Sequence, residues 1–362
     1  MRDTGIRALQ TAAVAVAFAL ALSGCSAAPD PPATSTENAP PETLASGLKV
    51  PWSVVPVEGG GALISQRDEG NVLELTPDRE LRVAGALPDV SAGGEAGLNG
   101  LAVHEEGGVR WLYAYHATAD DNRVVRMPLT GEPGSLSLDL AREEVVLRGI
   151  PVSANHNGGR IAFGPDGMLY VATGDAGQRE ASQDPASLSG KILRLSPDGS
   201  PAPGNPGGTA VYSLGHRNVQ GLAWSADGTL WASEFGQDTW DELNRIVPGG
   251  NYGWPLHEGV AGADGFVDPV RAWKPSEASP SGIAVYDGGT VLVAGLRGER
   301  LWIVDGSDPS SAWATFTGEF GRLRDVVAGP RGSIWVLTNN TDGRGSPEKG
   351  DDRLLQVTLP EG

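Results

Sequence analysis

The chain has little cysteine and little positive charge. Cys25 is its one cysteine, so no disulfide can form within the chain. Against 45 Asp and Glu there are 27 Lys and Arg, which gives a formal net charge of −18 at pH 7. Such an acidic protein is a poor partner for nucleic acid. To bind an anionic ligand it must gather its few cations locally, so clustered arginines are candidate site residues.

Long heptads and amphipathic helical runs are also absent, which argues against a helical bundle or a coiled coil. The chain is instead rich in turn residues, with 52 Gly and 27 Pro, as a many-stranded β protein requires. One large β domain fits this composition better than two ordinary domains, because all-β folds often exceed the usual domain length.

Long apolar runs are missing apart from residues 12–22 near the N terminus. This run follows Arg2 and Arg7 and is too short for a typical membrane span. The next residues, Leu22-Ser23-Gly24-Cys25, resemble a bacterial lipobox, in which Cys25 becomes the lipidated first residue after cleavage. An ordinary signal peptide with an incidental cysteine is the alternative. No other segment of the sequence could span a bilayer.

We therefore predict three parts of the chain. Residues 1–24 are a lipoprotein signal peptide, and residues 25–43, rich in Ala, Pro, Ser and Thr, are a disordered tether. Residues 44–362 are the folded domain. We expect this domain to work outside the cytoplasm, attached to the bacterial cell membrane through the lipid anchor only.

Strand signatures recur through the folded part in six pairs, in which a Gly-led strand precedes a second strand by about ten to about twenty-five residues. A period of roughly 45 to 60 residues built only from strands is typical of propeller blades rather than of a helical solenoid. The sequence thus predicts an all-β, six-bladed β-propeller. The first strands begin at Gly61, Gly108, Gly167, Gly228, Gly289 and Gly332, and the second strands begin near Asn71, Asn122, Lys191, Glu242, Arg300 and Arg353.

Polar residues follow the first strand of each pair, which we expect to be the inner strand of its blade. Arg67 follows Ser65, for example, and Asp175 follows Thr173 by two positions. Because these strand ends lie on one face of a propeller, residues far apart in sequence become neighbours at the mouth of the central channel. One such polar segment is explained by a connecting turn, whereas several on one face favour a binding site.

Several specific segments occur in order along the chain, and together they resemble the soluble glucose/sorbosone dehydrogenase family. These are quinoproteins that oxidise sugars with pyrroloquinoline quinone (PQQ). The resemblance runs from about Leu48 to Leu359 and implies a six-bladed propeller, in agreement with the six strand pairs. The segments are Asn155–Arg160, Gly174-Asp175, Gly190–Leu195, His216–Ala223, Asp241–Asn244, Gly249–Pro255, Leu296–Gly298 and Arg322–Asp325.

The resemblance implies a site for PQQ, a planar quinone with three carboxylates. Arg322 and Arg324 match the two arginines that grip carboxylates, for which the guanidinium fork is suited. Arg297 stands where well-studied glucose dehydrogenases carry Lys, so the charge is kept but the geometry differs. Arg217 would donate to the quinone oxygen as negative charge develops there, and Asn218 would bind beside it.

The resemblance also implies calcium, which would polarise the quinone carbonyl that receives hydride. The backbone carbonyls of Gly236 and Gln237 match its two protein ligands. The second position is commonly Pro, so Gln237 keeps the ligand oxygen but loses the stiffness of the proline ring. Glu242 and Tyr252 match positions that hold a further, structural calcium in some relatives, although Glu242 could equally be a solvated loop carboxylate.

His156 matches the catalytic base of the family, which takes the proton from the anomeric hydroxyl of the sugar while hydride leaves the carbon. Asn155 replaces the neighbouring family carboxylate, so Asp175 is the candidate for tuning His156. Glu95 stands where relatives often place Gln near the reacting centre. Its charge either lowers the affinity for an anionic cofactor or is removed by protonation in a desolvated site.

The sequence thus predicts a lipid-anchored, PQQ-dependent aldose dehydrogenase that acts on a small-molecule sugar and leaves the electron acceptor open. A non-enzymatic propeller that binds a glycan or a protein partner at the cell surface is the alternative, because propellers host many functions. Retention of His156 and Arg217 with the cofactor arginines favours the enzyme. The substitutions at Asn155, Gln237 and Arg297 count against it. Hydrolase chemistry lacks an obvious nucleophile.

Overall fold

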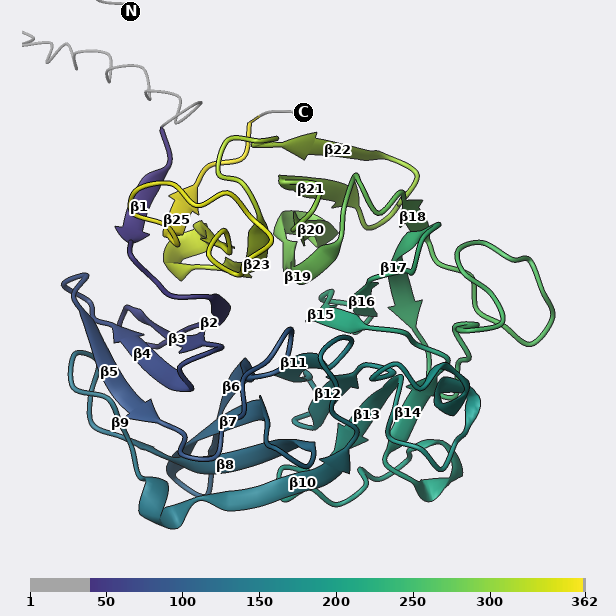
Figure 1. Ribbon diagram of the computed structural model, residues 1–362, viewed down its shortest axis with the longest axis horizontal. Coiled ribbons are helices and arrows are strands. Elements are labelled where there is room, and N and C mark those ends of the chain that lie inside the picture. The colour runs from purple at the N-terminus through teal and green to yellow at the C-terminus, as the bar shows by residue number, and fades with distance from the viewer. Residues whose placement is uncertain (1–39, 361–362) are drawn as a thin grey trace, which may run out of the picture. The chain divides into compact units, whose positions relative to one another are not determined.

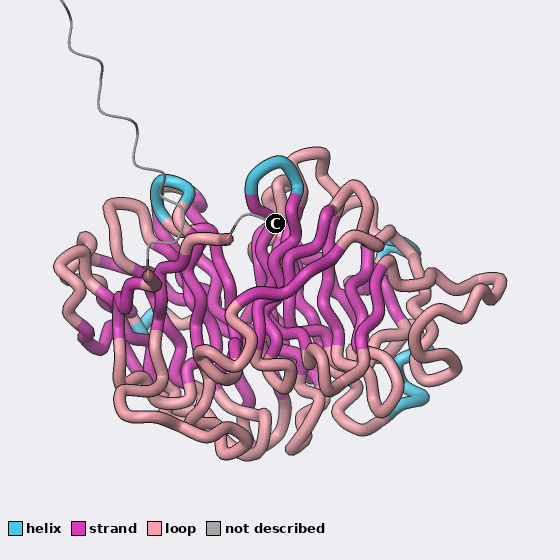
Figure 2. The backbone as a smooth tube through the Cα atoms, turned by 90° about the horizontal axis from the view of Figure 1, so that it is seen from above, coloured by secondary structure: helices cyan, strands magenta, loops and turns pink. Residues whose placement is uncertain are grey.

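Six antiparallel sheets stand in a ring in the computed structural model, which describes residues 40–360 (Figure 1). Each sheet has four main strands, and seen from the side they run through the thickness of the ring with loops at both faces (Figure 2). The predicted six-bladed β-propeller is therefore confirmed. Among the described residues no helix is long and apolar enough to cross a membrane. Cys25 and the predicted signal peptide lie outside the described residues, as does most of the predicted tether.

The first three blades are built from consecutive strands of residues 51–214. Blade one has β2 (Pro51–Pro56), β3 (Ala62–Gln66), β4 (Asn71–Leu75) and β5 (Leu81–Ala86). Blade two has β6 (Leu98–Glu106), β7 (Val109–Ala117), β8 (Asn122–Thr130) and β10 (Glu144–Ile150), with the short β9 (Ser137–Leu138) paired to β8. Blade three has β11 (Gly158–Phe163), β12 (Leu169–Thr173), β13 (Lys191–Leu195) and β14 (Val211–Leu214).

Blades four to six follow, and five short 3₁₀ turns lie between strands. Blade four has β15 (Val219–Trp224), β16 (Leu230–Glu234), β17 (Asp241–Ile246) and β18 (Arg271–Trp273). Blade five has β19 (Pro280–Tyr286), β20 (Thr290–Gly295), β21 (Arg300–Asp305) and β22 (Ala312–Thr315). Blade six has β23 (Leu323–Ala328), β24 (Ile334–Thr338), β25 (Leu354–Val357) and β1 (Glu42–Ala45). The 3₁₀ turns are η1 (Leu140–Arg142), η2 (Arg179–Gln183), η3 (Pro206–Gly208), η4 (Asp287–Gly289) and η5 (Pro330–Gly332).

Blade six closes the ring because its outermost strand comes from the other end of the chain. Strand β1 pairs antiparallel with β25, with Glu42 opposite Gln356. The predicted boundary at residue 44 falls inside β1, so the folded part begins earlier, at Glu42. Closure by a strand pair removes the open edge that the first and last blades would otherwise expose.

The strand pairs found in the sequence are the second and third strands of each blade, so the expectation that they include the inner strand was wrong. The innermost strands are β2, β6, β11, β15, β19 and β23. Four of them, β6, β11, β15 and β19, escaped detection because they carry glycine where neighbouring blades crowd at the axis. A Cβ at Gly221 in β15 would meet the Ser281 carbonyl, and one at Gly282 in β19 would meet the side chain of Asp325. Glycine interrupts the β-branched pattern by which strands are recognised.

All six innermost strands also shift register against their neighbours near their first residues, as between Leu323 and Asp325 in β23. Such bulges bend a strand and turn its side chains. Here they lie at one face of the ring, where the inner strands begin and the second strands end. The bulges therefore turn the first residues of each inner strand toward the channel mouth.

Apolar side chains pack between adjacent blades, so the core is divided into six clusters around the ring. The channel at the centre is filled by polar groups instead. Arg160 in β11 forms an ion pair of 2.9 Å with Asp325 in β23, donates through Nε to the Gln220 carbonyl, and lies over the ring of Trp52. These contacts join blades one, three, four and six and give the site above them a rigid floor.

Candidate active site

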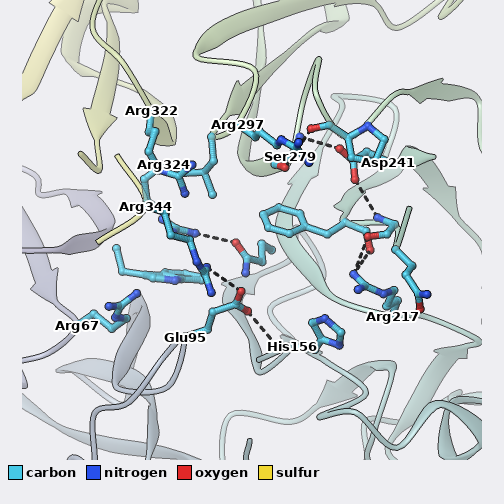
Figure 3. Close-up of a pocket in the computed structure, with 17 residues that line it drawn as sticks. Arg67, Glu95, His156, Arg217, Asp241, Ser279, Arg297, Arg322, Arg324 and Arg344 are labelled. Atoms are coloured by element: carbon cyan, nitrogen blue, oxygen red, sulfur yellow. Dashed lines mark hydrogen bonds and ion pairs between the residues drawn. The ribbon is translucent and has the colours of Figure 1, made fainter. Parts of the chain in front are cut away.

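A cavity of about 400 Å³ opens at the channel mouth, where the inner strands begin (Figure 3). Most of the residues predicted for the site line it, although they come from distant parts of the sequence. Arginines gather on one side of the cavity, and His156, Arg217 and Asp241 lie across from them. The predicted residues that line the cavity are Glu95, His156, Arg217, Gly236, Gln237, Arg297, Arg322 and Arg324.

The remaining predicted residues lie behind this cavity or beside it. Asp175 contacts His156 from below, and Asn218 is buried with its Oδ1 accepting the Gly158 N–H at 3.0 Å. Glu242 and Tyr252 line a smaller space of about 10 Å³ that shares Arg217 and Gly236 with the main cavity. The structure thus brings together every predicted site residue that it describes.

His156 is held from both its ring and its backbone. Its Nδ1 lies 2.8 Å from Asp175 Oδ1, and its backbone N–H donates to Glu95 Oε2 at 2.9 Å. The residue has φ of +57°, in the left-handed region that non-glycine residues seldom adopt. Such strained residues concentrate at functional sites, where the surrounding contacts hold them in place. The ring is partly exposed and faces the cavity.

Asp175 is a buried carboxylate with several donors. The Gly177 N–H donates to its Oδ1 at 2.8 Å and the indole N–H of Trp254 donates to its Oδ2 at 2.9 Å. Burial alone would raise the pKa of Asp175, but the hydrogen bonds from His156, Gly177 and Trp254 lower that pKa below its usual range. Asp175 is therefore ionised at neutral pH and fixed in orientation beneath the imidazole.

Glu95 has a partner that the sequence did not suggest. Arg344, in the loop between β24 and β25, forms an ion pair of 2.9 Å with Glu95 and donates to Asn155 Oδ1 at 3.4 Å. Neither expectation for Glu95 anticipated this arrangement, in which an arginine balances its charge. Glu95 and Asn155 are the two positions near His156 that depart from the family pattern, and one arginine contacts both.

The arginines on the far side of the cavity outnumber their acidic partners. Arg322 pairs with the buried side chain of Asp342 at 3.0 Å, whereas Arg324 lies 3.9 Å from the same carboxylate. Burial, together with the positive charges of Arg322 and Arg67, lowers the pKa of Arg324 to about 9 against the opposing effect of Asp342. Among the described residues, the buried Nε atoms of Arg322 and Arg324 have no hydrogen-bond partner. The cluster therefore favours an anionic ligand.

Arg217 reaches across to the loop that follows β16. Its Nη1 donates to the Gly236 carbonyl at 2.6 Å and to the Phe235 carbonyl at 3.2 Å, and its guanidinium lies 5.4 Å from the ring of Trp254. Burial lowers the pKa of Arg217, although Asp175 and Glu234 act in the opposite direction. A cationic group thus already lies on one of the two carbonyls predicted to bind calcium.

The second predicted calcium position is more enclosed. Glu242 accepts the Gly259 N–H at 2.7 Å, and burial together with the charge of Glu234 raises its pKa to about 8. The Tyr252 hydroxyl donates to the Arg245 carbonyl at 2.6 Å and is satisfied within the protein. No group of three or more His, Cys, Asp or Glu within residues 40–360 is arranged to hold a metal. A cation at either position would therefore depend on backbone carbonyl oxygens.

A buried hydrogen-bonded chain of Ser213, His216 and Glu234 lies near this second position. His216 contacts Ser213 Oγ through Nε2 and Glu234 Oε2 through Nδ1, both at 2.8 Å. Ser213 and His216 are both fully buried and neither lines the cavity, so they offer no exposed nucleophile. This hydrogen-bonded chain holds the segment before Arg217 in place, because Glu234 also accepts the Arg217 backbone N–H.

Several residues of the site received no predicted role from the sequence. Two of them were at least close to a signal, since Gln220 lies within a family motif and Arg67 follows a strand. Arg344 and Asp342 had none, because they belong to a loop without a recognisable pattern. Their roles depend on contacts with residues far away along the chain. The lining residues without a predicted role are Trp52, Arg67, Gln220, Phe235, Asp241, Pro275, Ser279, Leu296 and Arg344.

Comparison with known proteins gives one family. The family model for glucose/sorbosone dehydrogenases matches residues 48–349. A PQQ-bound structure of an aldose sugar dehydrogenase from Streptomyces coelicolor is 50% identical, with a TM-score of 0.81 over 87% of this chain and 96% of that chain.

Two curated relatives agree with this match. The aldose sugar dehydrogenase YliI of Escherichia coli is 31% identical over 83% of this chain and 90% of its own length. Quinoprotein glucose dehydrogenase B of Acinetobacter calcoaceticus is 29% identical over 64% of this chain and 55% of its own length.

Proposed function

The chain belongs to the glucose/sorbosone dehydrogenase family and is a PQQ-dependent sugar dehydrogenase, and we propose that it oxidises aldoses at the anomeric carbon with His156 as base and calcium as a second cofactor. One observation carries this proposal. A histidine fixed by a buried carboxylate faces the same 400 Å³ cavity as a cluster of arginines short of acidic partners. The base and an anion site thus stand on opposite sides of one space.

The residues of the cavity suit PQQ. Three carboxylates need cationic donors, and Arg297, Arg322 and Arg324 supply them from blades five and six. The Nε atoms of Arg322 and Arg324 lack protein partners within the described chain, so a ligand carboxylate would satisfy buried donors. When bound, PQQ would accept the hydride of the sugar, and calcium would supply Lewis-acid polarisation.

The proton is handled by the pair of His156 and Asp175. With Nδ1–H donated to Asp175, the lone pair of Nε2 is free to accept the proton of a sugar hydroxyl. The ionised Asp175 then stabilises the imidazolium that forms, and Trp254 and Gly177 keep the carboxylate from turning away. Arg217, on the same side of the cavity, can stabilise negative charge that develops beside it.

The proposed calcium site is formed by the backbone carbonyls of Gly236 and Gln237, in the loop between β16 and β17. The Gly236 carbonyl accepts a hydrogen bond from the guanidinium of Arg217, and this contact with a cationic group supports the proposal. A metal ion there would compete with Arg217 for this oxygen.

Titration of the purified protein with PQQ, with and without calcium, tests the proposed function. We expect calcium-dependent binding, followed by reduction of a redox dye when aldoses are added. Binding of PQQ without dye reduction by any aldose of a broad panel would favour a ligand-binding propeller instead. A protein that binds no PQQ would overturn the proposal entirely.

We further propose that the enzyme is anchored outside the cytoplasm by a lipid on Cys25. The proposal is supported by the lipobox and by the start of the propeller at Glu42, which leaves residues 25–41 as a tether. Fully extended, this tether is at most roughly 60 Å long, so the propeller would stay close to the membrane.

Replacing Cys25 with Ser should release the protein from the membrane, because the thiol that carries the lipid is removed. Fractionation of cells into membrane and soluble material, with intact-mass measurement of the mature protein, checks this. The matched control is Ser26→Ala, which alters the neighbouring residue and should leave the protein in the membrane fraction. Full membrane retention of the Cys25→Ser variant after normal processing would contradict the anchor.

A further inference from the structure

The loop between β16 and β17 wraps around a single carboxylate. Oε1 of Glu258 accepts hydrogen bonds from four consecutive backbone N–H groups, those of Gln237 at 2.7 Å, Asp238 at 3.2 Å, Thr239 at 3.0 Å and Trp240 at 3.1 Å. Consecutive amides that converge on one anion form a nest. Glu258 itself belongs to a different segment, the long connection between β17 and β18, so the contact joins two loops.

The nest fixes the direction of the carbonyls on its far side. In a trans peptide the N–H and C=O point in opposite directions. The N–H of Gln237 shares its peptide with the Gly236 carbonyl, and the N–H of Asp238 shares its peptide with the Gln237 carbonyl. Because both N–H groups point at Glu258, both carbonyls point away from it. The Gly236 carbonyl meets Arg217 Nη1 on the cavity side, as this geometry requires.

A second carboxylate extends this arrangement by one peptide. Asp241 Oδ1 accepts the Gly236 N–H at 2.9 Å, and the carbonyl of that peptide, from Phe235, also points to Arg217. A Cβ at Gly236 would clash with the Trp240 carbonyl oxygen and lie 2.7 Å from Glu258 Oε1, so this position leaves no room for a side chain. The loop is therefore fitted closely around its two acidic anchors.

Position 237 explains why the chain needs such an anchor. Proline would fix the backbone there through its ring, but it has no N–H to donate. Gln237 lacks the ring and instead makes the shortest of the four hydrogen bonds to Glu258. Hydrogen bonds can thus hold the loop where a covalent ring does not.

We propose that Glu258 is a positioning residue that aims the Gly236 and Gln237 carbonyls at the calcium site. The inference rests on the proposed function, since it assigns a residue to the calcium part of that function. Glu258 does not line the main cavity, although it lines the smaller space beside Glu242 and Tyr252. It acts through the peptides whose N–H groups it binds. It is held in turn from β17, because the N–H of the next residue, Gly259, donates to Glu242.

The test compares calcium dependence with calcium-independent binding in the full-length protein. In Glu258→Ala we expect the calcium concentration needed to promote PQQ binding to rise about tenfold, because one anchor of two ligand carbonyls is lost. PQQ binding in the presence of a chelator should stay unchanged, since the arginines are untouched. The amides of residues 237–240 should exchange with deuterium faster. In Glu258→Gln, which keeps the shape and one acceptor, the effects should be smaller.

The matched control is Asp268→Ala. Asp268 also binds backbone N–H groups of an exposed loop, those of Ala261 and Gly262, but it does not contact residues 236–240. This variant should leave calcium dependence unchanged. Adding Gln237→Pro to Glu258→Ala should restore calcium affinity, because the ring replaces the lost anchor. If the Ala variant does not fold, Glu258→Gln with and without Gln237→Pro gives the same comparison.

The outcomes separate this inference from the proposed function. A wild-type protein that binds PQQ without any calcium effect overturns the calcium site and the role of Glu258 together. A calcium-dependent wild type, combined with an unchanged calcium response or unchanged amide exchange in the Glu258 variants, overturns only the positioning role. A tenfold shift that Asp268→Ala fails to reproduce supports it.

Discussion

Replacing His156 with Ala should lower sugar oxidation per folded, PQQ-loaded molecule by roughly a hundredfold or more, the usual contribution of a positioned base. The imidazole contacts Asp175 through Nδ1 and presents its other nitrogen to the cavity. No other imidazole lines this cavity among the described residues, so none can replace it. Affinity for PQQ and calcium should stay close to that of the wild type, because the arginines and the loop carbonyls are unaffected.

The pH profile gives a second readout for His156. Activity of the wild type should rise with pH, because only the neutral imidazole accepts a proton. The lowered pKa of Asp175 keeps that carboxylate ionised through the neutral range, so its own titration lies at acid pH and does not produce this rise. Asp175→Asn removes a negative charge that favours the imidazolium, so the rise should move to lower pH.

The same carboxylate makes a separate prediction for stability. A carboxyl whose pKa is lower in the folded protein than in the unfolded chain stabilises the fold above the unfolded value, which is about 3.9 for Asp. That contribution is lost as the pH falls through the folded value. The difference in unfolding free energy between wild type and Asp175→Asn should therefore shrink in strong acid, apart from any pH-independent cost of the amide.

His104→Ala is the matched control, since His104 stacks on Phe163 and does not line the cavity. It should alter stability without altering turnover per folded molecule. If His156→Ala behaves in the same way, with near-normal turnover once unfolded protein is excluded, His156 is not the base. Most of the argument for catalysis at this cavity would then fail.

The number of blades could be predicted from the sequence because the second and third strands keep a clear β pattern. Leu63 in β3 and Leu112 in β7, for example, pack between blades one and two, and such strands read as apolar and β-branched. The innermost strands β15 and β19 could not be recognised, because Gly221 and Gly282 are required by the close approach of neighbouring blades. The close approach of the blades exists only in the closed ring, and in the sequence it is visible only as a glycine that interrupts the strand pattern.

The residues of the candidate site also fall into two groups, those that the sequence could identify and those that it could not. His156, Arg217 and Arg322 stand in specific motifs, so their meeting in one cavity could be predicted. Arg344 could not, because its partner Glu95 lies 249 residues away and neither residue marks the other in sequence. Glu258 was missed for a similar reason, since a lone glutamate in a long loop gives no sign that four amides converge on it.

Replacing Arg322 or Arg324 with Ala should weaken PQQ binding by at least tenfold. Truncating one partner of a buried, hydrogen-bonded charge pair typically costs about 2–5 kcal/mol, which exceeds the ~1.4 kcal/mol of a tenfold change. Both guanidinium groups are buried beside the cavity and have a free Nε among the described residues. A ligand carboxylate at this place gains donors that carry no cost of desolvating an exposed arginine.

The two variants should differ in their effect on the protein without ligand. Arg322→Ala leaves Asp342 with Arg324 at 3.9 Å, so a buried carboxylate loses its closest cation. Arg324→Ala leaves the closer pair of Arg322 and Asp342 intact and removes a donor from Gln220 at 2.8 Å and from Ser281 at 3.3 Å. Arg322→Ala should therefore destabilise the ligand-free protein more, as measured by urea denaturation, while both lose affinity for PQQ.

Calorimetric titration with PQQ measures these affinities, and two further variants serve as controls. Arg331→Ala changes an exposed arginine in η5, at the opposite end of β23 from the site, and should leave affinity unchanged. Arg297→Lys tests the exposed position at the rim of the cavity. Substantial PQQ binding should remain if this position only supplies a positive charge. Binding should be lost if the guanidinium holds a carboxylate through two hydrogen bonds. Wild-type affinity in both Arg322→Ala and Arg324→Ala would place the carboxylates of PQQ elsewhere, since two buried cations facing the cavity could not be removed from a true anion site without cost.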